Sequence, residues 1–246
     1  MDLMLLQMPS GISLISIDGI QNISIESSSL VTFYIFNRGD IHLTISVQKL
    51  ETIHMYWGGY NVFASRESTN SNTSVKIFAP NLKTLKWRGK LRNSQSLGRL
   101  DSLEEVEILL EPPKNEFDKV LEVLCGICLA KVLIINGKTI KALYKEGSTP
   151  TLILDNIRNL SICESLNKKF VLALVSLLRR MPNLNILCIK TRCWKLTYRT
   201  ASHFGNEYWK LQNLAFIHQL KEVSIENSYG CNEIEFERYI LGVLKI

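Results

Sequence analysis

Two cysteines, Cys125 and Cys128, have the spacing in this 246-residue chain that is most typical of reactive or metal-binding thiols. Two thiolates three positions apart can share a metal ion or form a disulfide. A structural zinc site needs further ligands, and Cys188 and Cys193 are the nearest thiols but do not form a second CxxC pair. The pair also lies in an apolar run with helical spacing. We therefore expect reduced, buried structural thiols, with no metal and no other cofactor.

Histidines and phosphate-binding loops give no stronger indication of catalysis. The four histidines are far apart and form no paired-ligand motif such as HExxH; they are His42, His54, His203 and His218. GxSxG, Walker-type and GxGxxG sequences are absent from the chain. The sequence therefore predicts a protein that is not an enzyme and has no catalytic residues.

Cations and flat rings gather in one stretch near the C-terminus. The members of this basic and aromatic cluster are Lys190, Arg192, Trp194, Lys195, Tyr198, Arg199, Tyr208, Trp209 and Lys210. Proteins bind single-stranded nucleic acids with this combination, but Arg, Trp and Tyr also dominate protein–protein interfaces. The spacing matches no RNA-binding motif. We favour protein recognition and keep nucleic-acid binding as an alternative.

Composition excludes disorder and points away from membranes. Hydrophobic residues make up 46% of the chain, which is enough for a sizeable core, and the formal net charge is +6. Each apolar run is shorter than a bilayer requires, so we expect no membrane association. Because no Lys or Arg precedes Arg38, the start lacks the positive end of a secretory signal. We expect a cytoplasmic or nuclear protein.

A six-residue pattern, apolar-x-x-apolar-x-apolar, recurs along the chain. Its occurrences are Ile20/Ile23/Ile25, Leu50/Ile53/Met55, Leu82/Leu85/Trp87, Leu103/Val106/Ile108, Leu129/Val132/Ile134, Ile157/Leu160/Ile162, Leu184/Leu187/Ile189 and Leu220/Val223/Ile225. The four occurrences that start at Leu103, Leu129, Ile157 and Leu184 are almost evenly spaced, with the period typical of leucine-rich repeats. Each occurrence predicts a short strand whose alternate side chains enter a shared core, so that stacked units form a parallel sheet.

Helical spacing fills the gaps after two of these strands, over residues 117–128 and 170–178. Right-handed crossovers place such helices on the convex side of the sheet. The predicted fold is therefore α/β, a leucine-rich-repeat-like solenoid with a curved parallel β-sheet and helices on its convex side. We expect irregular repeat-like strands over residues 1–74, a regular array over 75–205 and a separate C-terminal segment over 206–246.

Several segments carry a family resemblance. Residues 77–87 read IFAPNLKTLKW and resemble the strand beginnings of plant F-box proteins with leucine-rich repeats (LRRs); residues 181–184, MPNL, repeat the same signature. The tail resembles the FBD segment that closes many such proteins, in residues 208–209 (YW), 213–225 (NLAFIHQLKEVSI) and 232–241 (NEIEFERYIL). The resemblance implies a non-enzymatic protein-interaction module, similar to the substrate-recognition arm of an F-box (SCF-type) ubiquitin ligase adaptor.

The chain departs from this family in two places. Members of the family begin with an F-box that docks on a Skp-type adaptor, and residues 1–60 contain no match to it, so we do not expect this chain to bind Skp. The FBD-like segment 206–246 is expected to be truncated after its YIL motif. The absent F-box leaves a freestanding LRR scaffold, unconnected to ubiquitination, as an alternative function.

The repeat register predicts which side chains face a protein partner. Residues between core positions should lie on the concave face, so that Lys86 on one strand lies beside Glu107 on the next and both stay exposed. The candidate contacts are His54, Tyr56, Lys86, Arg88, Glu105, Glu107, Ser161, Lys190, Glu222, Ser224 and Glu226.

Overall fold

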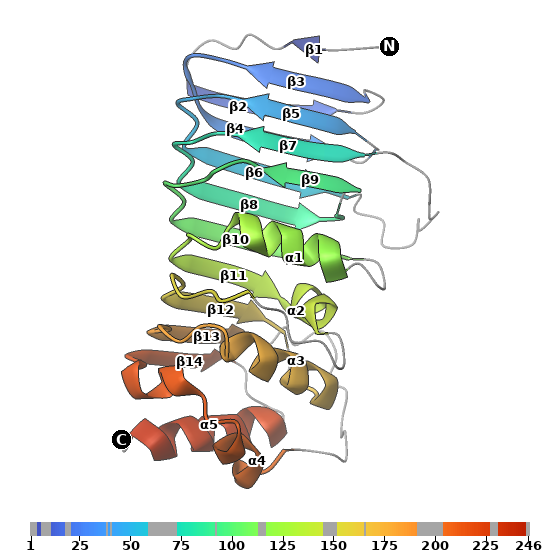
Figure 1. Ribbon diagram of the computed structural model, residues 1–246. Coiled ribbons are helices and arrows are strands. Elements are labelled where there is room, and N and C mark those ends of the chain that lie inside the picture. Colours follow the sequence, from blue (N-terminus) through green and yellow to red (C-terminus); the bar gives the residue numbers. More distant parts are fainter. Residues whose placement is uncertain are drawn as a thin grey trace. The chain divides into compact units, whose positions relative to one another are not determined.

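Parallel strands follow one another along nearly the whole chain in the computed structural model (Figure 1). It describes residues 4–5, 11–17, 21–37, 39, 41–58, 73–91, 93–112, 117–144, 152–164, 166–190, 204–226 and 231–244. The chain divides into two compact units, residues 1–130 and 131–246. The division predicted at residues 74/75 and 205/206 stays a prediction.

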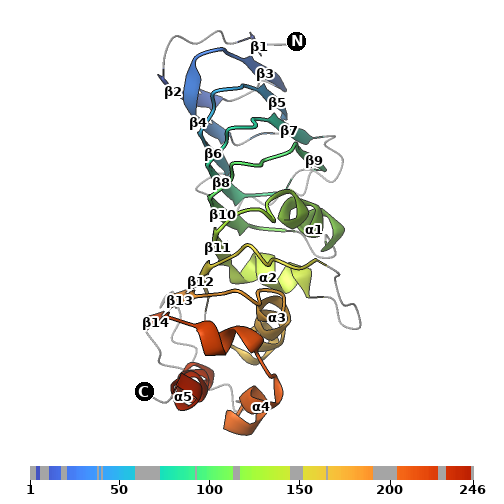
Figure 2. The same cartoon turned by 60° about the vertical axis from the view of Figure 1, so that its left-hand side comes forward.

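The first unit is built from two parallel sheets whose strands alternate along the chain (Figures 1 and 2). One sheet contains, in spatial order, β2 (Gly11–Ile17), β4 (Leu30–Asn37), β6 (Thr52–Trp57), β8 (Thr84–Gly89) and β10 (Glu105–Leu110). The other contains β1 (Met4–Leu5), β3 (Asn22–Glu26), β5 (His42–Ser46), β7 (Ser74–Phe78) and β9 (Ser94–Leu97). Helix α1 (Phe117–Gly126) packs against β9.

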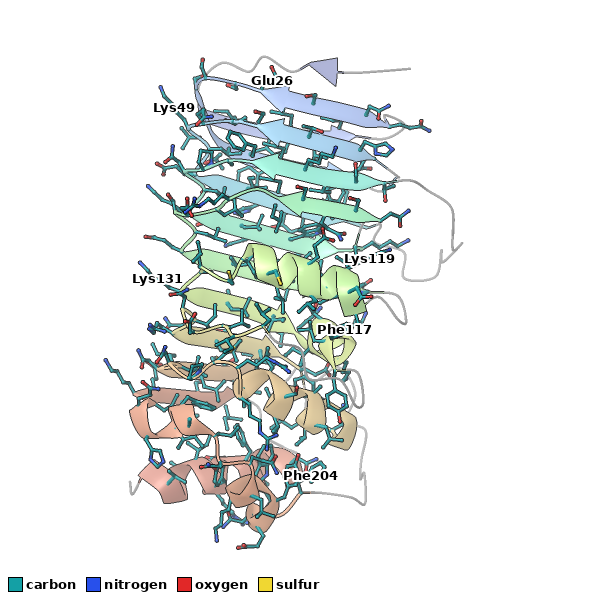
Figure 3. The ribbon with its side chains drawn as sticks, in the orientation of Figure 1. Glu26, Lys49, Phe117, Lys119, Lys131 and Phe204 are labelled. Atoms are coloured by element: carbon teal, nitrogen blue, oxygen red, sulfur yellow. The ribbon has the colours of Figure 1, made fainter. Side chains whose placement is uncertain are left out.

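Alternation of inward and outward residues along the strands creates the core of the first unit. Phe33, Ile53 and Leu85 point inward from the first sheet and are fully buried, as are Leu43 and Val75 from the second. Side chains fill the space between the two sheets (Figure 3). We call a strand of the first sheet together with the return segment that follows it a coil. A single coil encloses no core of its own, so its apolar residues are buried only when coils stack.

The second unit combines parallel strands with helices. Its strands are β11 (Val132–Asn136), β12 (Asn159–Cys163), β13 (Ile186–Lys190) and β14 (Glu222–Glu226), paired in chain order. The return segments hold α2 (Gly137–Leu143), α3 (Lys168–Leu178), α4 (Asn206–Leu211) and the 3₁₀ helix η1 (Ala215–Gln219), and α5 (Cys231–Leu244) follows the last strand.

Asparagine caps fix where the two central helices of this unit begin. The Asn136 side chain accepts a hydrogen bond from the Thr139 backbone N–H at 2.9 Å, and Asn167 accepts one from the Phe170 N–H at 3.1 Å. Such caps satisfy backbone donors that a helix leaves without partners at its first turn. Helices α2 and α3 then pack against each other.

The predicted fold class is confirmed, because the strands are parallel, the sheets are open and helices accompany them. The helices predicted over residues 117–128 and 170–178 are confirmed as α1 and α3. Before β10, the described return segments form a second sheet in place of the expected helices on the convex side. The occurrence at Ile23/Ile25 lies in this second sheet, and the matching occurrence in the first sheet is Leu30/Phe33/Ile35. The return segments alternate with period two, which is the spacing of a strand.

The predicted register is wrong by one residue in β11. Leu133 and Ile135 are fully buried and pair in register with Leu160 and Ile162, whereas the predicted core residue Leu129 is 44% exposed. Residues 132–135 are all apolar, so two overlapping six-residue patterns fit this strand. When the pattern starts at Ala130 instead, the three steps between Leu103 and Leu184 become equal in length.

Two neighbouring substitutions test the corrected register. Leu133→Ala removes a fully buried side chain and should lower the free energy of unfolding by about 2–5 kcal/mol. Ile134→Ala, on the opposite side of the strand and only half-buried, should cost about 1 kcal/mol or less. Urea denaturation of both variants measures the difference, and a larger loss for Ile134→Ala would restore the original frame.

Candidate protein-binding face

The outward side of the first sheet carries aromatic and charged residues in rows across the strands. One row runs from Tyr34 on β4 through His54 on β6 and Lys86 on β8 to Glu107 on β10. The next row contains Phe36, Tyr56, Arg88 and Leu109, and the preceding one contains Thr32, Thr52, Thr84 and Glu105. We name this surface the ring-and-charge face and define it as Tyr34, Phe36, His54, Tyr56, Lys86, Arg88, Glu105 and Glu107.

The aromatic part of the face lies on β4 and β6. The rings of Tyr34 and His54 meet edge to face, with centroids 4.5 Å apart and planes inclined at 72°. His54 and Tyr56 adopt a similar arrangement on one strand at 6.5 Å. Edge-to-face pairs are a favoured geometry of aromatic rings, and here they hold three half-buried rings in fixed positions.

The charged part lies on β8 and β10. Arg88 donates from Nε to the Glu107 carboxylate, and its guanidinium lies 5.5 Å from the centre of the Tyr56 ring. The second ion pair joins Lys86 Nζ to Glu105 Oε1 at 3.7 Å. Each cation of β8 is therefore paired with a carboxylate of the next strand, and Arg88 also connects the charged part to the rings.

The predicted neighbourhood of Lys86 and Glu107 is confirmed, because the two residues are register partners. The predicted exposure of Glu107 is wrong, since only 5% of this residue is accessible to solvent. The reason is a diagonal pairing. Arg88 lies two residues after Lys86 on β8 and reaches diagonally across to Glu107. Its long side chain shields the carboxylate and is itself 45% exposed.

Burial and nearby cations keep His54 neutral. Partial burial is the largest cause that lowers the pKa of His54, and the positive charge of Lys86 is the next. Glu107 opposes these effects, Arg88 adds to them, and Glu105 opposes them more weakly. His54 therefore acts as an uncharged ring between two tyrosines at neutral pH.

The remaining predicted contacts lie on β12, β13 and β14 in the second unit. Ser161 and Ser224 flank Cys188 in one row across three strands, and Glu222 lies on the last strand. Lys190 pairs with Glu226 at 3.2 Å, and hydrogen bonding to this carboxylate raises the pKa of Lys190.

The structure thus gathers six of the predicted contacts on one face and distributes the other five over strands of the second unit. The six on the ring-and-charge face are His54, Tyr56, Lys86, Arg88, Glu105 and Glu107. The other five are Ser161, Lys190, Glu222, Ser224 and Glu226. That any of them contacts a partner stays a prediction.

Two residues of the face were missed in the sequence. Tyr34 and Phe36 lie on β4 and point to the same side as His54 and Tyr56. The signal was present, because Leu30, Phe33 and Ile35 form the same six-residue pattern as the other strands. Applying that pattern here would have placed Tyr34 and Phe36 outside the core.

The described members of the basic and aromatic cluster are engaged within the fold. Trp209 is fully buried, with its ring 4.5 Å from that of Phe236 and 6.4 Å from that of Tyr239. The ring centre of Tyr208, also on α4, lies 4.0 Å from that of Phe204, and Lys210 pairs with Glu207 at 2.8 Å. Cluster residues 192–199 lie outside the described part of the chain. The described members therefore do not form an open surface for stacking bases.

The prediction of buried cysteines is wrong for the CxxC pair. Cys125 is exposed in the last turn of α1, and Cys128 lies just beyond the helix and is half-buried. Partial desolvation, with Cys128 and Glu122 nearby, raises the pKa of the Cys125 thiol and makes it a weak nucleophile. Within the described residues, no three ligating side chains gather where they could hold a metal ion.

The helices of the described residues are also too short or too polar to cross a bilayer. Their longest member, α5, has 14 residues, fewer than the roughly 20 that a membrane span requires.

Replacing the buried carboxylate tests the charged part of the face. Glu107→Gln removes the charge that pairs with Arg88 and should lower the free energy of unfolding by about 1–3 kcal/mol. Glu105→Gln is the matched control, because its pair with Lys86 is long and exposed and should contribute at most about 1 kcal/mol. Equal losses in the free energy of unfolding of the two variants, measured by chemical denaturation, would show that burial of Glu107 does not strengthen its ion pair.

The neutral imidazole of His54 predicts a pH dependence of stability. Because the folded pKa lies below 6.5, the unfolded chain binds more protons as the pH falls through 6.5, and stability decreases. The loss between about pH 7.5 and about pH 5 should be smaller for His54→Gln than for the unchanged chain. Thermal unfolding at both pH values measures this difference. An equal loss in the two proteins would mean that the pKa of His54 does not change on folding.

Comparisons with known proteins were made by sequence and by structure. No protein-family model matches the chain, and no solved structure matches it. An F-box/FBD/LRR-repeat protein of Arabidopsis thaliana is 25% identical over 195 residues, which cover 71% of this chain and 39% of the relative. An F-box/LRR-repeat protein of the same plant is 33% identical over 132 residues, which cover 52% of this chain and 29% of the relative.

The chain thus spans well under half the length of either relative. Both matches agree with the family resemblance in the strand beginnings and the tail, and both relatives are named for leucine-rich repeats. By sequence, the chain is similar to an F-box/FBD/LRR-repeat protein and an F-box/LRR-repeat protein of Arabidopsis thaliana.

Proposed function

We propose that the chain is a non-enzymatic module that binds a protein partner through the ring-and-charge face. The observation that carries this proposal is the density of Tyr and Arg on one regular surface of β4, β6 and β8. These residue types contribute most to protein–protein binding, since they combine a large apolar area with a polar group. The edge-to-face rings and the Arg88–Glu107 pair fix the side chains before binding, which reduces the entropy lost on association.

The finer part of the proposal is a role in ubiquitination. The names of both relatives include the term F-box, and the family resemblance implies a repeat surface that contacts the protein to be modified. We propose that this chain is the substrate-recognition arm of such an SCF-type adaptor, in the cytoplasm or nucleus. In this arrangement the repeat face contacts the substrate, and a Skp-type adaptor binds an F-box and not this chain. A freestanding scaffold would use the same face without ubiquitin transfer.

Affinity purification from plant cells, followed by mass spectrometry, tests the face. Tyr34→Ala combined with Tyr56→Ala should reduce the recovery of specific partner proteins about tenfold or more. The control combines Thr44→Ala and Lys76→Ala, which alter exposed outward residues of the second sheet and should change nothing. Circular dichroism confirms folding of both variants. Partners that survive the tyrosine substitutions would contradict a binding role for this face.

The ubiquitin role needs a separate measurement. The cellular abundance of a recovered partner should fall when the chain is joined to an F-box, and the tyrosine substitutions should prevent that fall. Unchanged abundance, despite binding, would favour the freestanding scaffold.

A further inference from the structure

The charges around His54 do not cancel at the centre of the ring-and-charge face. In decreasing order of their effect on His54 they are Lys86, Glu107, Arg88 and Glu105. Lys86 therefore outweighs Glu107, and Arg88 outweighs Glu105. The face is formally neutral, but its two cations, Lys86 and Arg88, act on His54 more strongly than its two carboxylates, and we call these two cations the positive centre.

Solvent exposure strengthens this imbalance. The side chain of Arg88 is 45% exposed, whereas that of its partner Glu107 is 6% exposed, so the cation of this pair faces solvent. In the other pair the side chain of Glu105 is 40% exposed and that of Lys86 is 27% exposed, but Glu105 lies opposite Thr84, in the row next to the one that contains His54 and Lys86. An approaching anion therefore meets the cation of the Arg88–Glu107 pair before it meets the carboxylate of that pair.

An apolar platform borders the positive centre. Tyr34 and Tyr56 lie on either side of His54 at ring distances of 4.5 and 6.5 Å, and both are half-buried. Lys86 is the register partner of His54, so the positive charge and the rings are one strand apart. Strands in a sheet are about 4.8 Å apart, which is less than the span of two residues in an extended peptide.

We propose that the ring-and-charge face recognises an acidic, apolar segment of the partner protein. The partner's carboxylate lies beside Lys86 and His54, and the apolar side chain next to it packs on Tyr34 and Tyr56. Charge complementarity selects this occupant, because Lys86 lies beside His54 in the same row and Arg88 is far more exposed than its partner Glu107. The inference rests on the proposed function and names the chemistry of its partner.

Proton binding by His54 couples to this recognition. The groups that face His54 are Tyr34 on β4, Tyr56 on β6, Lys86 and Arg88 on β8, and Glu105 and Glu107 on β10. A carboxylate bound beside the imidazole favours its charged form, and by linkage the charged form strengthens binding of the carboxylate. The affinity for an acidic segment should therefore rise as the pH falls below neutral.

Three short peptides of equal length provide the probe, with a central Glu-Phe-Glu, Gln-Phe-Gln or Lys-Phe-Lys in a Gly/Ser background. NMR titration of the whole chain measures affinity and follows the His54 ring signals. The Glu-Phe-Glu peptide should bind about tenfold more tightly than Gln-Phe-Gln, the gain typical of one charge-assisted contact. It should bind about threefold more tightly near pH 5.5 than near pH 7.5, and it should raise the pKa of His54.

Variants of two lysines separate this face from general surface charge. Lys86→Gln should remove the preference for Glu-Phe-Glu over Gln-Phe-Gln. Lys83→Gln is the matched control, because Lys83 also pairs with a glutamate, Glu51 at 3.0 Å, but lies outside the face. His54→Gln should keep the preference for the acidic peptide and lose its pH dependence.

Equal binding of the Glu and Gln peptides, tighter binding of the Lys peptide, or equal effects of the two lysine variants would overturn the proposal. Preference for oligouridylate over Glu-Phe-Glu would also overturn it in favour of a nucleic acid. If the acidic peptide does not bind but the tyrosine substitutions still reduce the recovery of protein partners, the proposed function stands and only the specificity for acidic segments is rejected. If both fail, the face is not a binding surface.

Discussion

Burial of two inward side chains per strand is the interaction on which both units depend. Leu85 and Trp87 on β8, like Leu160 and Ile162 on β12, are fully buried between neighbouring strands of the same sheet and the layer opposite. Each such side chain stabilises the fold by roughly 1.5–3 kcal/mol, whereas a single coil has nothing to bury it against. The parallel register follows, because a slip of one residue would expose the whole inward row. The outward row is then free to carry charges and rings.

The same constraint explains how far the sequence predicted the structure. Strand positions follow from alternation, so the placement of Lys86 beside Glu107 could be predicted from the apolar residues around them. Alternation does not show which residues are buried where successive residues are all apolar, as in residues 132–135. There the pairing with β12 determines that Leu133 and Ile135 point inward. The prediction that Glu107 is exposed failed for another reason. Pairing across strands depends on side-chain length, and Arg88 reaches a carboxylate that its own register partner, Leu109, does not provide.

The face and the core place opposite demands on the same strands. Inward positions favour apolar groups, so the polar contacts of β6, β8 and β10 concentrate on the outward side. There the charged pairs run diagonally from β8 to β10, and no carboxylate lies on β6 to pair with the cations from the other direction. The rings occupy that side instead. An aromatic region and a positive centre are thus a consequence of the strand order, since the cations lie between a strand of rings and a strand of carboxylates.

The length of a coil limits which element can return the chain to the sheet. A short strand such as β5 covers about 17 Å with its five residues, and a helix needs about 11 residues to cover the same distance. A coil that returns through a helix must therefore be longer. The step from Ile157 to Leu184, which contains the 11-residue α3, is longer than the step from Leu82 to Leu103, which contains the four-residue β9.

The step that follows Leu103 obeys the same relation. It ends at Ala130 in the corrected register, equals the step from Ile157 to Leu184 in length, and contains α1. Coil length therefore limits the return segment in one direction only. A short coil leaves room for a strand alone, whereas the longer coil from Leu50 to Leu82 also contains a strand, β7. The shorter step from Leu82 leaves room for a strand but not for a helix, so spacing alone would have identified the second sheet at this coil.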